Sequence, residues 1–191
     1  MSRSTGLGPV TVSSVLGLYE RRGHEHYGED VTQLQHALQC AEHAACACAA
    51  DELVAAALLH DVGHLIADER SPEWRDDVDD DRHEAAGARI VASLLGPRAA
   101  APVALHVTAK RWRCAVDPTY HAALSTASAA SLVAQGGPLD AAACARFEAH
   151  RAFDDAVALR GWDDAAKDPA ASVGSLGDFE PLLARLAAGR T

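Results

Sequence analysis

The chain has 191 residues, a length that suits one well-buried core better than two. Its formal net charge of −10 opposes contact with nucleic-acid phosphates and anionic lipid, so we expect neither a nucleic-acid partner nor a membrane partner. No apolar stretch approaches the length that spans a bilayer, and residues 1–15 contain no continuous apolar region. We therefore predict a cytoplasmic protein.

The composition predicts an all-α fold, because alanine is abundant and only three Phe, three Tyr and three Trp are present. We interpret residues 1–9 as a polar tail and residues 10–191 as one helical domain. Apolar periodicity, turn residues and candidate caps predict the helices in chain order: 10–23, 31–49, 51–67, 83–95, 98–113, 117–134, 139–160 and 179–186. Asp51 and Asp140 are the expected N-caps of two of them, and the charged residues 68–82 are expected to form a surface loop.

The strongest local signal is ALLHDVGH, which places His60 and Asp61 side by side near the end of a very apolar helix. Burying a carboxylate and an imidazole among Ala and Leu is costly unless something compensates, and a metal ion compensates both. His64 lies four residues after His60 and is expected on the same side of the helix. This segment therefore predicts a metal site.

Further candidate ligands lie on separate predicted helices, namely His36, His83 and His106, and Asp163 occurs in RGWDD. Helices that aim such side chains into a shared core can build a dinuclear site, which a carboxylate such as Asp61 can bridge. Taken singly, each of these histidines is more often a core or surface residue with a hydrogen-bond partner. Imidazole with carboxylate suits Fe, Mn or Zn, but ligand chemistry alone does not choose redox iron over a hydrolytic metal. Four other histidines have no comparable context: His24, His43, His121 and His150.

Several longer motifs extend this pattern over most of the chain, from about Leu16 to Lys167. They are QLQHALQCAEHA, LLHDVGH, HEAAGA, HVTAKRW, LSTAS, QGGPLD, and RGWDD followed by Lys167. Together they resemble the HD-domain diiron oxygenases of the PhnZ type, the 2-amino-1-hydroxyethylphosphonate dioxygenase family. The resemblance implies a single-domain HD-type helical bundle with two iron ions in a mixed-valent Fe(II)/Fe(III) state. It also implies an organophosphonate substrate, a 2-amino- or 2-ammonio-1-hydroxyalkylphosphonate, whose C–P bond is cleaved with O2 to give phosphate and a carboxylic acid such as glycine.

The resemblance also implies roles for individual residues. One iron would be held by His36, His60, Asp61 and Asp163, and a second, bridged by Asp61, would be held by His83 and His106. His64 would lie near the substrate. Glu29 would receive the substrate amine; without the resemblance it is an acid at the start of a helix. The groups expected to face the phosphonate are Lys110, Ser128 and Arg160, each of which is otherwise interpreted as a solvated surface residue. We expect catalytic roles for His64, Glu29 and Lys110.

One position departs from the family pattern. The family has a tyrosine three residues before its glutamate, whereas here that position is His26 and the tyrosine follows at Tyr27. Either the loop is shifted by one residue or His26 has taken the gating role, so we include both among the expected substrate contacts. The alternative function is a metal-dependent HD-type phosphohydrolase acting on a small phosphate ester or nucleotide. A silent metal-binding module is a third interpretation, and the sequence does not predict the oligomeric state.

Overall fold

The computed structural model describes residues 10–26, 30–70 and 80–189, with the backbone alone for 67–70 and 80–83. Regular structure in this part of the chain is helical, apart from one isolated antiparallel bridge between His26 and Thr32, so the all-α prediction is confirmed. The predicted tail, residues 1–9, lies outside the described residues. The helices are α1 (Val12–Arg22), α2 (Gln33–Cys46), α3 (Asp51–Leu59), α4 (Val62–Arg70), α5 (Asp80–Leu95), α6 (Pro97–Val116), α7 (Pro118–Ala122), α8 (Thr126–Ala134), α9 (Ala141–Glu148), α10 (Phe153–Ala165) and α11 (Leu176–Ala188).

Helix starts follow local capping chemistry. Thr11 and Ser14 form a capping box at the start of α1, and Thr32 and Gln35 form one at the start of α2. In each box, both side chains accept hydrogen bonds from backbone N–H groups that would otherwise be unpaired. Asp140 caps α9 as predicted, its carboxylate accepting from the backbone N–H three residues later. Helix α6 follows Gly96, whose φ of 91° lies in the left-handed region that favours glycine.

The predicted helix 51–67 is wrong in its continuity and in its cap. Asp51 is the first helical residue, and Ala50 occupies the N-cap without a side-chain hydrogen bond. Helix α3 ends at Leu59 and α4 begins at Val62, so His60 and Asp61 lie at a junction between two helices. Adjacent side chains on an unbroken helix project about 100° apart. At the junction they meet, with His60 Nε2 3.3 Å from Asp61 Oδ2.

Two other predicted helices are each split in two. Residues 117–134 form α7 and α8, because Ser125 accepts a hydrogen bond from the Ser128 N–H and starts a new helix. Residues 139–160 form α9 and the first part of α10, with a turn in which His150 Nδ1 accepts from the Ala152 N–H. Helix α5 begins at residue 80 rather than 83, and α11 begins at residue 176 rather than 179 because Ser175 and Asp178 form a capping box there.

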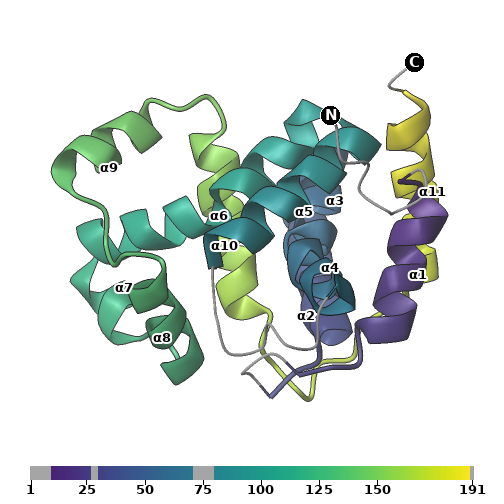
Figure 1. The fold of residues 1–191 in the computed structure, drawn as a ribbon, viewed down its shortest axis with the longest axis horizontal. Helices are drawn as coiled ribbons and strands as arrows, with labels where there is room; N and C mark the ends of the chain where they lie inside the picture. The colour runs from purple at the N-terminus through teal and green to yellow at the C-terminus, as the bar shows by residue number, and fades with distance from the viewer. Residues whose placement is uncertain (1–9, 27–29, 71–79, 190–191) are drawn as a thin grey trace.

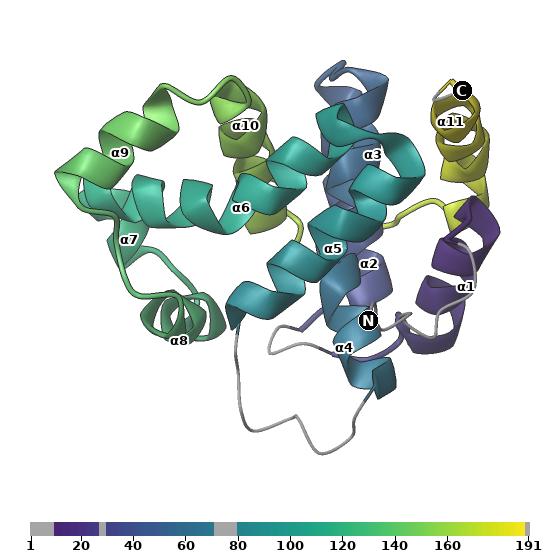
Figure 2. The ribbon, with the colours of Figure 1, turned by 45° about the horizontal axis from the view of Figure 1, so that its top comes forward.

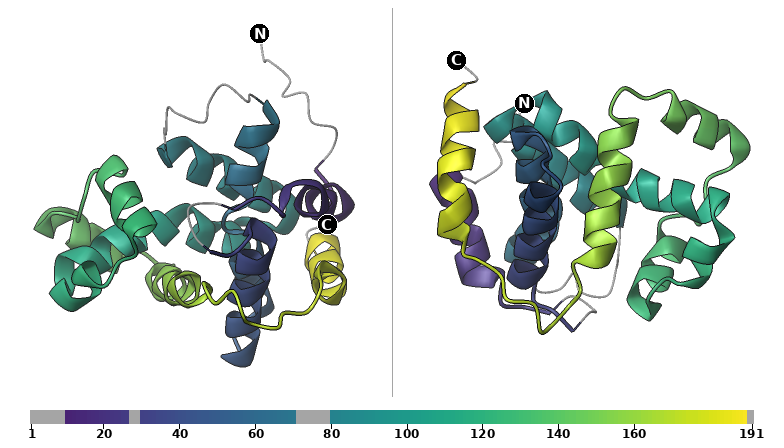
Figure 3. Two further views of the ribbon diagram at one scale, coloured as in Figure 1. Left: turned by 90° about the horizontal axis from the view of Figure 1, so that it is seen from below. Right: turned by 180° about the vertical axis from the view of Figure 1, so that it is seen from behind.

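The helices pack in an order that differs from their order in the chain (Figure 1). Helices α2 to α5 occupy the middle of the molecule, α1 and α11 lie side by side at one edge, and α6 and α10 cover the opposite side. Helices α7, α8 and α9 extend beyond α6 at the far end, as the rotated views confirm (Figures 2 and 3). The largest apolar cluster is built from α1 to α6 and α11. Its many buried alanines allow close packing of the helix backbones.

Two smaller clusters fix α10 against its neighbours. Leu159 packs with Cys40 and Val54, which ties α10 to α2 and α3. Trp112, Phe147 and Phe153 meet edge to face where α6, α9 and α10 converge, and the ring centroids of Trp112 and Phe153 are 4.9 Å apart. This packing holds the inner face of α10 toward α2 and α6.

The contact between α4 and α5 depends on two glycines. A Cβ added at Gly87 would lie 3.1 Å from the backbone nitrogen of Gly63. Such a close approach leaves no room for a side chain, so the start of α4 is held tightly against α5.

Among the described residues, no helix combines the length and the apolar character needed to cross a membrane. All five cysteines are free thiols: Cys40, Cys114 and Cys144 are buried, and Cys46 and Cys48 are exposed.

Candidate metal and anion site

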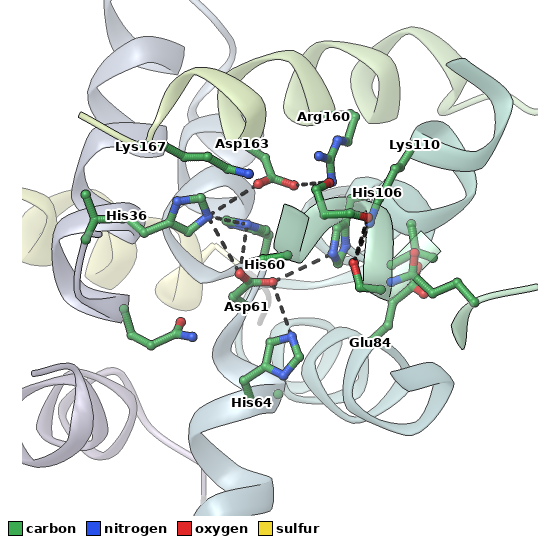
Figure 4. A pocket seen from close by; sticks show the side chains of 18 of the residues that line it. His36, His60, Asp61, His64, Glu84, His106, Lys110, Arg160, Asp163 and Lys167 are labelled. Carbon is green, nitrogen blue, oxygen red and sulfur yellow. Dashed lines mark hydrogen bonds and ion pairs between the residues drawn. The ribbon is translucent and has the colours of Figure 1, made fainter. Parts of the chain in front are cut away.

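Four parts of the fold aim imidazoles and carboxylates into one pocket, which Figure 4 shows from close by. His36 comes from α2, His60 and Asp61 from the junction of α3 and α4, His106 from α6, and Asp163 from α10. The three histidines and Asp163 are each less than one tenth exposed. The structure thus brings together five of the six residues predicted as metal ligands, although they span more than 120 positions of sequence.

Asp61 lies between two sets of imidazoles. Its Oδ2 faces His60 Nε2 at 3.3 Å and His36 Nε2 at 3.7 Å. Its Oδ1 faces His106 Nε2 at 3.7 Å and His64 Nε2 at 3.9 Å. Asp163 joins the first set, because its Oδ1 lies 3.4 Å from His36 Nε2. Asp61 therefore offers one oxygen to each side, the arrangement that a bridging carboxylate requires.

The backbone sets which nitrogen of each ring faces the pocket. His36 Nδ1 is 2.9 Å from the Ala166 carbonyl, His60 Nδ1 is 2.9 Å from that of Ala57, and His106 Nδ1 is 2.7 Å from that of Val103. A carbonyl oxygen can only accept, so each Nδ1 carries a proton and donates it. The Nε2 atoms are thereby directed inward as potential ligand atoms.

The donor set fits a metal ion. His36 Nε2 and His60 Nε2 face each other at 3.2 Å, and both rings already use Nδ1 as the donor. Two lone pairs at this separation repel each other unless a cation or a proton lies between them. Imidazole nitrogen with carboxylate oxygen is a ligand combination suited to iron, manganese or zinc.

The pKa shifts point to the same demand for positive charge. Burial alone lowers the pKa of His60, but the neighbouring Asp61 carboxylate outweighs it and raises the pKa to about 9. Burial tends to raise the pKa of Asp61, yet the surrounding imidazoles, His60 foremost, hold it far below its usual range. Burial and the repulsion of His60 lower the pKa of His106 to about 4. The carboxylates thus favour a cation beside His60, whether a proton or a metal ion supplies it.

A cationic wall lies beside this cluster. Lys110 is 2% exposed, Arg160 4% and Ser128 7%, and all three line the pocket. They are therefore not the solvated surface residues that the alternative interpretation required. Lys110 Nζ donates to Ser131 Oγ at 2.6 Å, and Arg160 Nη1 donates to Asp163 Oδ2 at 2.8 Å. The pocket has a volume of about 140 Å³ and can therefore hold a small anion beside the candidate metal ligands.

The remaining predicted site residues have different outcomes. His64 lines the pocket on the Oδ1 side of Asp61. His83 belongs to α5, but its side chain lies outside the described part of the structure, and so do Tyr27 and Glu29 altogether. His26 is exposed and is not among the pocket-lining residues, although its bridge partner Thr32 is. The four histidines without a sequence context, His24, His43, His121 and His150, are all exposed.

The structure adds residues that the sequence analysis did not assign. Cys40 lies one turn after His36, with its Sγ 3.8 Å from His36 Nε2, and forms with His36 and His60 a group whose ligand atoms lie within 4.8 Å of one another. The i, i+4 spacing from His36 was the signal for it. Other polar residues of the pocket wall received no individual role from the sequence, although all but Ser131 belong to the motifs quoted above: Gln33, Glu84, Ser131, Gln135 and Lys167. In Figure 4 the Lys167 side chain points toward Asp163.

A sequence model of the HD domain matches residues 34–134, more than half of the chain, and includes His36, His60, Asp61 and His106. The chain belongs to the HD-domain family. This HD-domain protein is 40% identical to the hydroxymethylphosphonate dioxygenase of Gimesia maris over 88% of its own length and 84% of that relative. It is 38% identical to the glycine-betaine-forming 1-hydroxy-2-(trimethylamino)ethylphosphonate dioxygenase of Leisingera caerulea, over 92% and 89% of the two chains. An uncharacterised protein of Acanthamoeba polyphaga mimivirus is 29% identical over 90% of this chain and 80% of its own.

Proposed function

We propose that this HD-domain protein is a diiron oxygenase that uses O2 to cleave the C–P bond of a 1-hydroxyalkylphosphonate, releasing phosphate and a carboxylic acid. The observation that carries the proposal is its identity of 38–40% to two phosphonate dioxygenases over about nine-tenths of the chain. The reaction is balanced, because both atoms of O2 enter the products, one in the carboxylic acid and one in phosphate. For a 2-amino-1-hydroxyethylphosphonate the acid is glycine.

We assign His36, His60, Asp61 and Asp163 to one iron, and His83 and His106 to a second iron that Asp61 bridges. The two oxygens of Asp61, directed to opposite sets of imidazoles, support the bridging role. Iron in a mixed-valent Fe(II)/Fe(III) pair would supply the redox chemistry with O2. The protein supplies ligands whose orientation is fixed by backbone carbonyls before any metal arrives.

The other side chains would bind and orient the substrate. Lys110, Ser128 and Arg160 offer an ammonium, a hydroxyl and a guanidinium to the phosphonate oxygens. His64 lies next to Asp61 Oδ1, where its imidazole can exchange a proton with the substrate hydroxyl. Glu29 is proposed to receive the amine, and His26 or Tyr27 is proposed to gate the iron site. These last three assignments stay predictions from the sequence, as do the cytoplasmic location and the absence of nucleic-acid and membrane partners.

The decisive experiment measures O2 uptake and product release together. Protein loaded anaerobically with ferrous iron is mixed with hydroxymethylphosphonate, 2-amino-1-hydroxyethylphosphonate or its trimethylammonium analogue, and O2, inorganic phosphate and the carboxylic acid are quantified. We expect equal amounts of O2 consumed, phosphate released and acid formed, with preference for a nitrogen-bearing substrate. Iron analysis with low-temperature EPR should show a mixed-valent pair perturbed by that substrate. Hydrolysis of phosphate esters or nucleotides without O2 uptake would instead establish the phosphohydrolase.

A further inference from the structure

Arg160 is held in place by a cluster of side chains outside the pocket. Its Nε donates to Tyr120 Oη at 3.0 Å, its Nη2 donates to the Asp164 carboxylate, and its Nη1 donates to Asp163 Oδ2 at 2.8 Å. Arginine has five N–H groups, so these bonds leave one on each terminal nitrogen. Arg160 lines the pocket while Tyr120 and Asp164 do not. Three neighbours therefore fix the plane of the guanidinium and leave it two donors for an anion.

Tyr120 suits this position because its hydroxyl can accept and donate at once. The Nε–H of Arg160 can only donate, so Tyr120 Oη accepts from it and donates its own O–H to Asp164 Oδ2 at 2.8 Å. Burial raises the pKa of Tyr120, so the hydroxyl keeps its proton near neutral pH. Phenylalanine at this position would leave Arg160 Nε without its partner, and Asp164 Oδ2 would keep only its bond from Arg113.

Arg113 closes the cluster on its outer side. Its Nη1 lies 3.3 Å from Asp164 Oδ2, and its guanidinium carbon lies 4.0 Å from the centroid of the Tyr120 ring. Arg113 thus restrains the face of the Tyr120 ring, while Arg160 is bonded to its hydroxyl. Two arginines then face two aspartates, Asp163 and Asp164, so the positive charge of Arg160 is balanced within the protein. Arg160 therefore serves an incoming anion chiefly through the direction of its remaining N–H groups.

The same bonds connect the cationic wall to the candidate metal ligands. Asp163 directs Oδ1 toward His36, while Arg160 occupies its Oδ2. Asp163 is thus restrained to offer a single oxygen to the metal side. A shift of Arg160 would move both this carboxylate and the donors that face the phosphonate.

We propose that Tyr120 is a positioning residue that orients Arg160 for the phosphonate or phosphate group. It acts through Arg160: among the described residues its hydroxyl bonds to Arg160 and Asp164, and Tyr120 does not line the pocket. Helix α7, only five residues long, serves to present this hydroxyl to α10 across 40 residues of sequence. The inference rests on the proposed function only for the identity of the anion, because a phosphohydrolase would need the same alignment.

The test compares Tyr120→Phe with Thr119→Val in metal-loaded protein. Thr119 Oγ1 donates to Asp117 Oδ1 at 2.6 Å, so Thr119→Val removes one hydroxyl hydrogen bond from the same short helix without touching Arg160. Anaerobic calorimetry measures the Kd of inorganic phosphate. We expect Tyr120→Phe to weaken binding about tenfold, the effect of losing a hydrogen bond to a charged group, and Thr119→Val to leave it unchanged. Metal content should match the natural protein in both variants.

A merely structural role for Tyr120 predicts different results. Equal phosphate affinity in Tyr120→Phe and the natural protein, or equal weakening by Thr119→Val, would overturn the proposal. If Tyr120→Phe fails to fold, Asp164→Asn tests the same chain of bonds from its other end, and unchanged phosphate binding there overturns it too. Turnover should show a raised KM with little change in kcat. Phosphate binding needs neither O2 nor C–P cleavage, so the two proposals can fail separately. If Tyr120→Phe weakens phosphate binding but the natural protein does not oxidise hydroxyphosphonates, the positioning role of Tyr120 stands and the proposed function is wrong.

Discussion

Lys110→Met should strongly weaken the binding of a phosphonate, because the Lys110 ammonium is a buried cation in the wall of the pocket. The side chain is 2% exposed on α6, and its Nζ contacts Ser131 Oγ at 2.6 Å within the pocket wall. Methionine keeps an unbranched stem of similar length and removes only the charge and its donors. The substitution therefore tests the ammonium with little change in packing.

The expected magnitude follows from this burial. Truncating one partner of a buried charge pair costs about 2–5 kcal/mol, which at about 1.4 kcal/mol per tenfold raises the Kd of a phosphonate by at least about 30-fold.

The assay is anaerobic calorimetry of the metal-loaded protein with hydroxymethylphosphonate, and urea denaturation checks that each variant is folded. Arg111→Met is the matched control, because Arg111 is the next residue of α6, carries the same charge and donates its Nε to the Gly137 carbonyl at 2.7 Å, away from the pocket-lining residues. Equal weakening in both variants would mean that the net field of the protein, not a direct contact, attracts the anion. An unchanged Kd in Lys110→Met would refute the assignment of Lys110 to the phosphonate.

Three further substitutions test the candidate metal ligands and the helix packing. Asp61→Asn should abolish O2 uptake and lower the amount of metal bound at both positions, because the two oxygens of Asp61 face both sets of imidazoles. Elemental analysis measures the bound metal, and loss of only half of it would contradict the bridging role. Gly87→Ala should destabilise the protein by about 1–3 kcal/mol in urea denaturation, because the added Cβ would meet the Gly63 backbone nitrogen at 3.1 Å. At Gly161, no atom lies within 4 Å of the added Cβ apart from its two chain neighbours and the backbone of its own helix. Gly161→Ala should therefore raise stability by about 0.5–1 kcal/mol, and equal effects at the two positions would contradict the packing argument.

Much of the fold was predictable because helix formation depends on residues close together in the chain. The existence of helices around His36, His60 and His106 followed from apolar periodicity, and the cap at Asp140 followed from residue type. The junction at His60 and Asp61 was not predicted, since its residues fit an unbroken helical pattern. Ser125 likewise starts a helix inside a segment whose composition gave no sign of a break.

The amino-acid sequence by itself determined the class of site: which helices carry imidazoles and carboxylates, and that they need a cation to be buried together. Only the tertiary structure decided that Asp61 faces two sets of imidazoles, that backbone carbonyls direct His36, His60 and His106 inward, and that Tyr120 reaches Arg160. The physical reason is separation along the chain. His36 and the Ala166 carbonyl are 130 residues apart, and no periodicity within a helix can encode a hydrogen bond that forms only when α2 and α10 pack together.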